Sequence, residues 1–243
     1  TFSHTPLILN SEGKKLSKRD CVTSIDEFRE MGYLPEALSN YMAFLGWSPK
    51  SADREILSLE EISEIFDLSE INKAGAKFSW EKLNWINSQY IKNMESIKLI
   101  EIMRKYWDDN GWEPPSQEWA NKLAILIRDS MTLLKDSIDQ SKPFFLIPTI
   151  QKEGQDFLEN RESKLSLKLI LNYLIEQNTI KLNKEKAKEI INEISKMHNI
   201  KKGILMKSLR VAFFGSLSGP DLIQSWELFA ESKTDRTRIE RCL

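Results

Sequence analysis

Cysteine, histidine, glycine and proline are all scarce in this chain of 243 residues. The two cysteines, Cys21 and Cys242, lie near opposite ends, and the two histidines are His4 and His198. Two cysteines without C-x-x-C spacing exclude a disulfide scaffold and a metal cluster, and they favour a reducing compartment. Nine glycines and eight prolines argue against a loop-rich or low-complexity chain.

Long hydrophobic runs and a large net charge are absent as well. No apolar run approaches the roughly 18–20 residues of a membrane span, so no membrane partner is expected. The first residues lack the basic and apolar regions of a secretory signal, which favours the cytoplasm. They form a short apolar run without an initial Met, which is typical of the middle of a longer protein. Lys and Arg number 35 against 36 Asp and Glu, which excludes a whole-chain polyelectrolyte such as a basic nucleic-acid tail.

The hydrophobic spacing predicts a mainly α protein of about ten helices, with at most a few short strands near the N-terminus. Capping boxes start helices at Ser24 and Ser58, where a Glu follows three residues later. His198 lies just beyond an apolar stripe that includes Met197, so it is interpreted as a cap or surface residue. Further helices are expected at 35–46, 81–91, 96–107, 116–134, 165–175, 184–198, 204–214, 221–230 and 235–243, with breaks at 108–116 and 142–148.

Charge is unevenly distributed along the chain. Residues 1–150 carry 18 basic and 23 acidic side chains, whereas residues 151–243 carry 17 basic and 13 acidic ones. Within 15 residues, no acid separates five cations, which are Lys196, Lys201, Lys202, Lys207 and Arg210. Such a patch is either a phosphate-binding face or a solvated surface, and charge alone does not decide between them.

One loop combines a glycine, a hydroxyl and four cations in seven residues, from Gly13 to Arg19. Lysines supply mobile positive charges, and a serine hydroxyl donates to a phosphate oxygen. Phosphoryl or nucleotidyl transfer needs such groups, because negative charge builds on the leaving pyrophosphate. The alternative is a solvated turn.

The surrounding sequence gives this loop a context. Lys15-Leu16-Ser17-Lys18-Arg19 resembles the K-M-S-K-S loop of class I aminoacyl-tRNA synthetases. The residues on either side, and their spacing, resemble those of bacterial-type glutamyl-tRNA synthetase. They include Phe2 to Leu9, Gly32 to Tyr41, Leu45 to Ser48, Asn72 to Phe78, Lys82 to Ile91, Leu209 to Ala212 and Gly215 to Pro220.

The resemblance implies the C-terminal portion of a ligase that uses ATP to attach L-glutamate to tRNA(Glu) through glutamyl-adenylate. It implies an end of the catalytic domain with the loop and a stem-contact region at 1–92. An all-helical anticodon-binding region in two bundles would follow at 93–148 and 149–243. The family's Rossmann core, with its H-I-G-H-like motif, is not found here, so this chain alone is expected to be inactive. A monomer is expected.

The resemblance also implies site residues. Lys18 would contact the ATP phosphates, with Lys15 and Ser17 assisting, and Mg2+ would accompany ATP in the full-length enzyme. No metal site and no cofactor are expected on this chain alone. Arg210 matches a position in the segment that approaches the anticodon in the family. Arg128 lies near the end of the helix in which discriminating relatives carry an Arg that reads the last anticodon base, but Ser130 stands two positions further on, so whether the enzyme discriminates between tRNAs stays open. Lys201, Lys202 and Lys207 are tRNA-binding candidates from charge. Where relatives carry Pro and Thr around Arg210, this chain has Ser208 and Phe214, so the individual base contacts stay open.

The aromatic residues have two interpretations, either core packing or stacking on unpaired bases. Trp85 and Trp119 fall on apolar stripes and are expected in the core, whereas Trp112, in a Gly/Pro-bounded break, is least expected there. Trp80, Tyr90 and Trp107 are the other candidates. The alternative function is a non-catalytic helical scaffold that binds RNA or protein.

Overall fold

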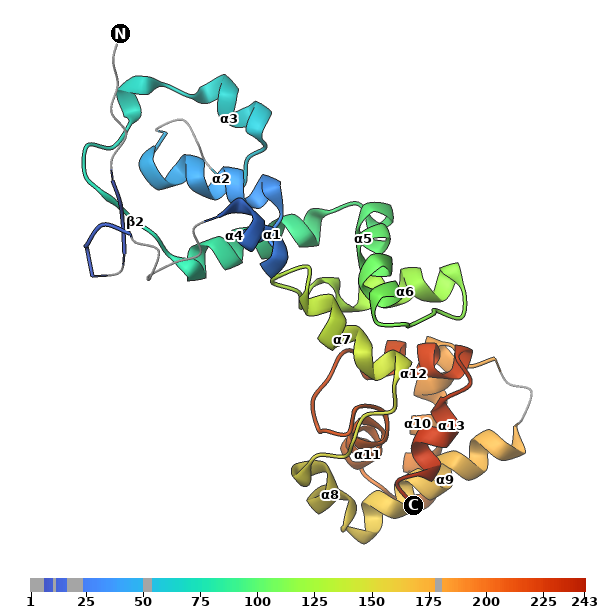
Figure 1. Cartoon of the computed structure of the whole chain (residues 1–243). Coiled ribbons are helices and arrows are strands. Elements are labelled where there is room, and N and C mark those ends of the chain that lie inside the picture. Colours follow the sequence, from blue (N-terminus) through green and yellow to red (C-terminus); the bar gives the residue numbers. More distant parts are fainter. Residues whose placement is uncertain (1–6, 11, 17–23, 50–53, 178–180) are drawn as a thin grey trace. The chain divides into compact units, whose positions relative to one another are not determined.

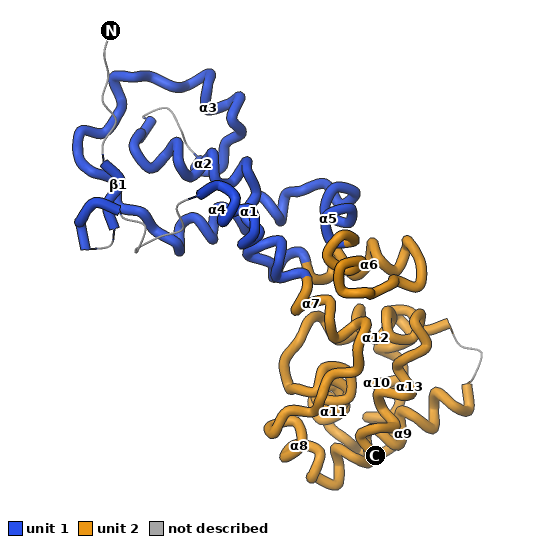
Figure 2. The backbone as a smooth tube through the Cα atoms, in the orientation of Figure 1, with its two compact units in different colours: residues 1–103, 128–137 blue, residues 104–127, 138–243 orange. Residues whose placement is uncertain are grey.

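The computed structural model describes residues 7–10, 12–16, 24–49, 54–177 and 181–243. Over these residues the chain is mainly α-helical, as the sequence predicted, and it has one short two-stranded parallel sheet (Figure 1). Two compact units divide the chain, namely residues 1–103 with 128–137 and residues 104–127 with 138–243 (Figure 2). Among the described residues, no helix is long and apolar enough to cross a membrane.

The first unit consists of short helices and a small two-stranded sheet at one edge (Figure 1). Its elements are β1 (Ile8–Leu9), α1 (Ile25–Met31), α2 (Pro35–Gly46), α3 (Leu59–Ile65), the 3-10 turn η1 (Leu68–Glu70), β2 (Ala76–Lys77), α4 (Trp80–Asn93) and the first part of α5 (Ser96–Asp109). Both expected capping boxes are present, at Ser24 with Glu27 and at Ser58 with Glu61. Gly32 ends α1 at φ +96°, where a Cβ would lie 2.8 Å from the Lys135 backbone nitrogen.

Buried amide side chains hold the first unit together. Asn87, on α4, is fully buried, accepts a hydrogen bond from the Leu34 backbone N–H at 2.9 Å, and donates to the Thr132 carbonyl at 2.6 Å. The Leu134 N–H also donates to the Gly32 carbonyl at 3.0 Å. Segments far apart in the sequence therefore satisfy one another's backbone groups, and residues 128–137 pack as part of this unit.

The second unit is a helical bundle. It contains the rest of α5, α6 (Gln117–Arg128) up to Ile127, α7 (Asp136–Phe145) from Ile138, α8 (Lys152–Leu158), α9 (Arg161–Glu176), α10 (Lys184–His198), α11 (Lys202–Phe214), α12 (Leu222–Glu231) and α13 (Asp235–Glu240). Apolar stripes of α9, α10 and α11 meet in its core, with Ile170, Ile190 and Leu209 fully buried.

Two arginines at the end of the chain anchor this bundle. Arg238 is fully buried, and its guanidinium donates to the carbonyls of Phe213, in the last turn of α11, and Leu146, just after α7, at 3.0 and 3.2 Å. Arg241 donates to the carbonyls of Pro148 and Ala212. Carbonyls at helix C-termini carry partial negative charge, so the two guanidinium groups stabilise these helix ends.

The structure corrects four sequence-based expectations about helices. The helix expected at 116–134 ends at Arg128, because the Asp136 carboxylate accepts from the backbone N–H groups of Thr132 and Leu133, both at 2.8 Å, in a separate turn. The break expected at 142–148 begins later, after Phe145, since Pro143 lies in the last turn of α7. The helices α7, at 136–145, and α8, at 152–158, were not predicted. Met197 is 78% exposed and so lies off the apolar stripe.

Candidate functional site

The described part of the K-L-S-K-R loop begins in a tight hairpin. The Asn10 side-chain oxygen accepts from the backbone N–H groups of Glu12 and Lys14, at 3.1 and 2.9 Å, and Gly13 takes φ +80°. The Leu16 N–H then donates to the Ile8 carbonyl at 2.9 Å, which returns the chain along β1. The hairpin therefore fixes the backbone direction in which the loop starts.

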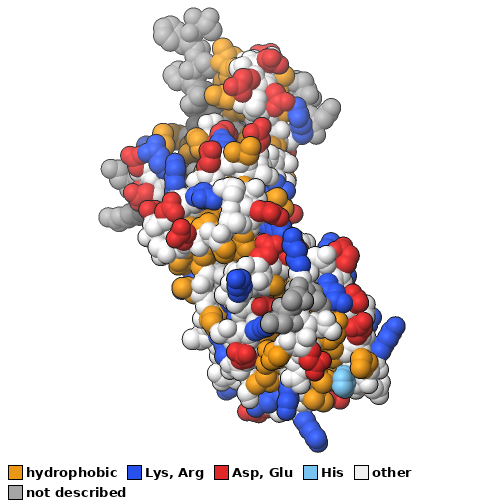
Figure 3. Space-filling view, turned by 90° about the vertical axis from the view of Figure 1, so that its right-hand side faces the viewer, with side chains coloured by type: hydrophobic (Ala, Val, Ile, Leu, Met, Phe, Trp, Pro, Cys, Tyr) orange, Lys and Arg blue, Asp and Glu red, His pale blue; other side chains and the backbone are white. Residues whose placement is uncertain are grey.

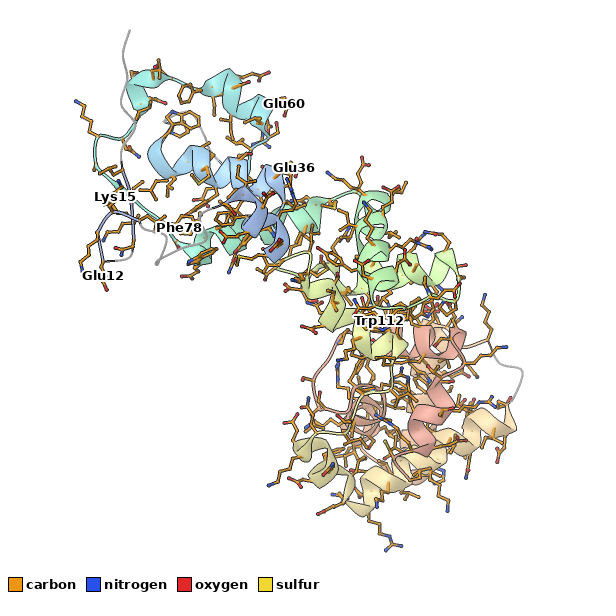
Figure 4. All side chains as sticks on the ribbon, in the orientation of Figure 1. Glu12, Lys15, Glu36, Glu60, Phe78 and Trp112 are labelled. Carbon is orange, nitrogen blue, oxygen red and sulfur yellow. The ribbon has the colours of Figure 1, made fainter. Side chains whose placement is uncertain are left out.

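Lys15 is the catalytic candidate that the structure describes. It bridges to Leu9 across the hairpin, and its side chain is exposed (Figure 4). The neighbouring Lys14 ammonium pairs with the Glu12 carboxylate at 2.9 Å, with both side chains exposed. Ser17 and Lys18 lie outside the described residues, so their role stays a prediction.

Three of the lysines proposed to bind phosphate lie on or beside α11. Lys201 is the N-cap of this helix and Lys202 its first residue, and both are exposed, as is Lys207. No side chain caps the N-terminus of α11, and its first turn has no acid. The unpaired N–H groups of a helix N-terminus favour an anion, so the two charges at 201 and 202 add to an existing positive end.

The basic residues do not form one continuous band. Lys207 lies five residues after Lys202, more than one turn along the helix and on a different face. On the face shown in Figure 3, Lys and Arg side chains are interspersed with Asp and Glu side chains. A phosphate contact would therefore be local, at separate points along α11.

The two arginine candidates differ in their partners. Arg210 is half-buried, and its Nη1 donates to the carbonyls of Gly219 and Pro220, at 2.8 and 3.0 Å. Arg128 ends α6, and its Nε is buried without a hydrogen bond to any described residue, the Asp129 carboxylate being 3.7 Å away. Arg210 thus donates hydrogen bonds to backbone carbonyls, whereas the Nε–H of Arg128 donates to no described acceptor.

The aromatic expectations are partly confirmed. Trp107 and Trp119 are buried, and the Trp119 Nε1 donates to the Leu228 carbonyl at 2.9 Å. Trp112 was expected outside the core, yet it is only 9% exposed and stacks on Phe145 (Figure 4). The Trp112 ring is therefore buried, although the backbone of this residue lies in an irregular segment.

Trp85 was expected in the core and is instead 42% exposed. The Lys82 ammonium lies 4.4 Å from the centre of its ring, and that ammonium also pairs with Glu55. Trp85 was placed on the apolar face of its helix, but Leu83 and Ile86 are the buried residues there. Trp80 and Tyr90 are half-buried, and the Tyr90 hydroxyl donates to the Leu57 carbonyl at 2.6 Å.

Sequence reasoning missed the contacts that shape the turn after α11. The Gln151 N–H donates to the Gly215 carbonyl at 2.8 Å, and Glu153 accepts from the Leu217 N–H at 3.4 Å. Neither Gln151 nor Glu153 lies in a motif or a charge cluster that would have identified it from the sequence. Because these contacts join segments far apart in the sequence, local periodicity carries no signal for them.

Two family models cover most of the chain in order. Residues 1–85 match the catalytic domain of class I tRNA synthetases (E and Q), and residues 98–243 match the anticodon binding domain. Together with the helical fold, these matches identify the chain as part of a class I aminoacyl-tRNA synthetase that includes the anticodon binding domain.

Individual relatives show which family within this class the chain resembles. The chain is 97% identical over all 243 residues to the glutamate–tRNA ligases of Prochlorococcus marinus strains AS9601 and MIT 9301. It also matches the crystal structure of a glutamate tRNA ligase from Elizabethkingia meningosepticum CCUG26117, in complex with its amino acid. That match has a TM-score of 0.88 at 31% identity and covers 98% of this chain and 50% of that one.

The chain belongs to the bacterial glutamyl-tRNA synthetase family, as a C-terminal portion of it. It spans about half the length of the curated relatives it matches, 51% in the two relatives from strains AS9601 and MIT 9301.

Proposed function

We propose that this chain is the tRNA-binding portion of a glutamate–tRNA ligase, an enzyme that uses ATP to attach L-glutamate to tRNA(Glu). The match of residues 98–243 to the anticodon binding domain, after a catalytic-domain match at 1–85, is the observation that carries this proposal. The exposed, uncapped N-terminus of α11 with its two lysines supports it, because RNA phosphates are anions.

The proposal assigns tasks to regions. Residues 1–92 would carry the K-L-S-K-R loop and contact the tRNA stem, and residues 93–148 and 149–243 would form the two helical bundles that approach the anticodon. The monomer acts in the cytoplasm, with tRNA(Glu), ATP and L-glutamate as partners of the full-length enzyme. A protein-interaction scaffold is disfavoured by the two family matches.

The loop residues suit a polyphosphate. The ammonium groups of Lys15 and Lys18 and the hydroxyl of Ser17 would hold the phosphates of ATP, which supplies the leaving pyrophosphate of glutamate activation and binds with Mg2+. Lys15 is exposed at the end of the hairpin and able to turn toward a phosphate, since no described residue pairs with it. In the full-length enzyme, Lys18→Ala should therefore raise the activation barrier by about 2–4 kcal/mol, with smaller changes in KM.

The control for Lys18→Ala is Lys14→Ala, because Lys14 is already paired with Glu12 in the same hairpin. Pyrophosphate exchange should fall for the first variant and change little for the second. An unchanged exchange rate in Lys18→Ala would show that this lysine is a surface cation only.

Binding of tRNA by the purified chain tests the proposal as a whole. Filter binding of tRNA(Glu) at a series of salt concentrations should give an affinity that falls steeply with salt, because phosphate contacts release counterions. The Lys201→Ala/Lys202→Ala double variant should reduce the slope of log affinity against log salt by about one for each phosphate that the variant no longer binds. The matched control is Lys164→Ala/Lys168→Ala, which removes two lysines from α9. A wild-type chain without salt-sensitive RNA affinity would contradict the proposed function.

A further inference from the structure

A pocket of about 370 Å³ lies within the second unit, between the end of α9 and the turn that joins α12 to α13. Its apolar part is formed by Leu174 and Leu182, which are buried, and by Ala230. Arg236 closes one side, because its guanidinium donates to the Leu174 carbonyl at 2.6 Å. The volume is at the lower end of the range for small-molecule sites, about 300–1,000 Å³.

One acid and one base line this pocket without pairing with each other. Asp235 is only 6% exposed, and no described Lys or Arg forms an ion pair with its carboxylate. Burial raises the pKa of this carboxyl above its usual value, so a positive group beside it would offset the cost of burying its charge. Lys233 is exposed, and no described carboxylate pairs with its ammonium.

The backbone of Lys233 is itself unusual. It takes φ +58°, and the one other described non-glycine residue with a positive φ is Asn199. Asparagine adopts this region readily, whereas lysine does so at an energetic cost. The N–H groups of Lys233 and Thr234 donate to the carbonyls of Ala230 and Phe229, at 3.0 and 2.8 Å, and hold the turn in this conformation. A strained residue at the mouth of a pocket favours a role for its side chain there.

The two unpaired charges restrict the class of ligand. A purely anionic ligand would be repelled by the Asp235 carboxylate, and a purely cationic one by Lys233 and Arg236. A neutral ligand would leave the buried carboxylate without a counter-charge. A ligand that carries both an ammonium and a carboxylate satisfies both groups, and the apolar part of the pocket takes an aliphatic group.

We propose that this pocket binds a free α-amino acid with an apolar side chain. The ammonium of the amino acid pairs with the Asp235 carboxylate, its carboxylate pairs with the Lys233 ammonium, and its side chain contacts Leu174 and Leu182. None of these residues belongs to the K-L-S-K-R loop or to α11, to which the proposed function assigns ATP and tRNA. The inference therefore goes beyond the proposed function and does not require that the chain binds tRNA.

Leucine is the probe for this site, and two analogues each lack one of its charges. Leucinamide has no carboxylate, and 2-hydroxy-4-methylpentanoate has a hydroxyl in place of the ammonium. In titration calorimetry of the whole chain at neutral pH, leucine should bind at least about tenfold more tightly than either analogue, because each analogue loses one charge-assisted hydrogen bond.

Two variants should remove these preferences one at a time. Asp235→Asn should bind leucine and the hydroxy acid about equally, and it should still prefer leucine to leucinamide. Lys233→Met should bind leucine and leucinamide about equally and still prefer leucine to the hydroxy acid, and Lys233→Arg should restore the lost preference. The matched controls are Asp156→Asn, an exposed acid on α8, and Lys164→Met, an exposed lysine on α9, and both should behave as the wild type does.

The crossed pattern separates recognition from a structural role. An equal loss of affinity for all three ligands in a folded variant would overturn the ion pair assigned to that residue. Melting curves show which variants fold, and Lys233→Met, at an exposed position, keeps the inference testable if Asp235→Asn does not fold.

Two results with the wild-type chain would also overturn the inference. L-Glutamate that binds as tightly as leucine would contradict an apolar side chain in the pocket. No binding of leucine up to about 10 mM, ten times a dissociation constant of about 1 mM, would remove the site altogether. The proposed function would stand in either case, because it is tested by tRNA binding. A chain that binds leucine but no tRNA would keep the inference and lose the proposed function.

Discussion

The two units stabilise their backbones in different ways. The first unit uses neutral amides, and the Asn87 side chain bonds to the backbone of both Leu34 and Thr132. The second unit uses cations, and Arg238 and Arg241 bind carbonyls at and just beyond the ends of α7 and α11. A neutral amide supplies both donors and an acceptor, which suits the junction of irregular segments. A guanidinium supplies only donors, which suits a bundle where helix C-termini converge.

The largest expected difference in stability is between replacing a buried tryptophan and replacing an exposed one. Trp119→Ala removes a buried side chain that packs edge-on against Phe145, and it should lower the free energy of unfolding by about 3–5 kcal/mol. Trp85→Ala removes an exposed ring that carries the Lys82 ammonium over its face, and it should cost about 1 kcal/mol or less. Urea titration followed by circular dichroism measures both. Equal losses would mean that Trp85 packs as firmly as Trp119.

A second comparison concerns the buried polar groups themselves. Arg238→Met leaves the Phe213 and Leu146 carbonyls without their donor, and we expect a loss of about 3 kcal/mol in the second unit. Asn87→Ala leaves one N–H and one carbonyl unpaired, with an expected loss of about 2 kcal/mol in the first unit. Hydrogen exchange resolves which unit opens. Exchange that rises uniformly over both units in either variant would contradict separate anchoring.

The third effect depends on pH. Asp235 begins α13 and is 6% exposed, and burial raises the pKa of its carboxyl above the usual value, against the lowering effect of hydrogen bonds and of Arg236. A raised folded-state pKa gives stability that is present below the unfolded pKa and is lost as pH rises through the folded one. Asp235→Asn should therefore gain stability relative to wild type as the pH rises through and above the usual pKa of an aspartate carboxyl, about 3.9.

The control for this pH dependence is Asp156→Asn, which removes an exposed acid from α8. Its stability relative to wild type should change little over the same pH range. A flat difference for Asp235→Asn as well would show that the Asp235 carboxyl ionises as freely in the folded state as in the unfolded one.

The smallest effect concerns a surface cluster. The Lys122 ammonium, on α6, lies 2.5, 3.1 and 3.3 Å from the carboxylates of Glu231, Glu227 and Glu118. Partial burial opposes its charge, but the hydrogen bonds to these carboxylates raise the pKa of Lys122 well above its usual value. Lys122→Met should cost about 1 kcal/mol, and less at high salt, because exposed ion pairs are screened. Lys98→Met removes a single, more exposed pair with Glu36 and should cost less still. An equal cost at low and high salt would assign the loss to packing rather than to charge.

Sequence reasoning predicted the helical fold because its signals are local. The capping boxes at Ser24 and Ser58 and the stripe of α10, apart from Met197, were confirmed, since each depends on residues within a few turns. The predicted end of α6 was wrong, because the turn at 129–135, which the Asp136 carboxylate closes, is also held by bonds to Gly32 and Asn87, far away in the sequence. The exposure of Trp85 and the burial of Trp112 likewise depend on which helices pack beside them.

The candidate site was predictable to a similar extent. Charge located Lys201, Lys202, Lys207 and Arg210, and the structure places all four on or beside α11. Charge did not distinguish an arginine that donates to two carbonyls from a lysine that faces solvent, because that difference comes from the path of residues 215–220, the turn after α11. The roles of Ser17 and Lys18 stay predictions from the motif.

Hydroxyl-radical footprinting of tRNA(Glu) bound to this chain tests the central claim most directly. If residues 98–243 read the anticodon, the anticodon loop should be protected, and protection should weaken in the Lys201→Ala/Lys202→Ala variant. Uniform cleavage along the tRNA at concentrations that saturate binding, or protection confined to positions away from the anticodon arm, would contradict it.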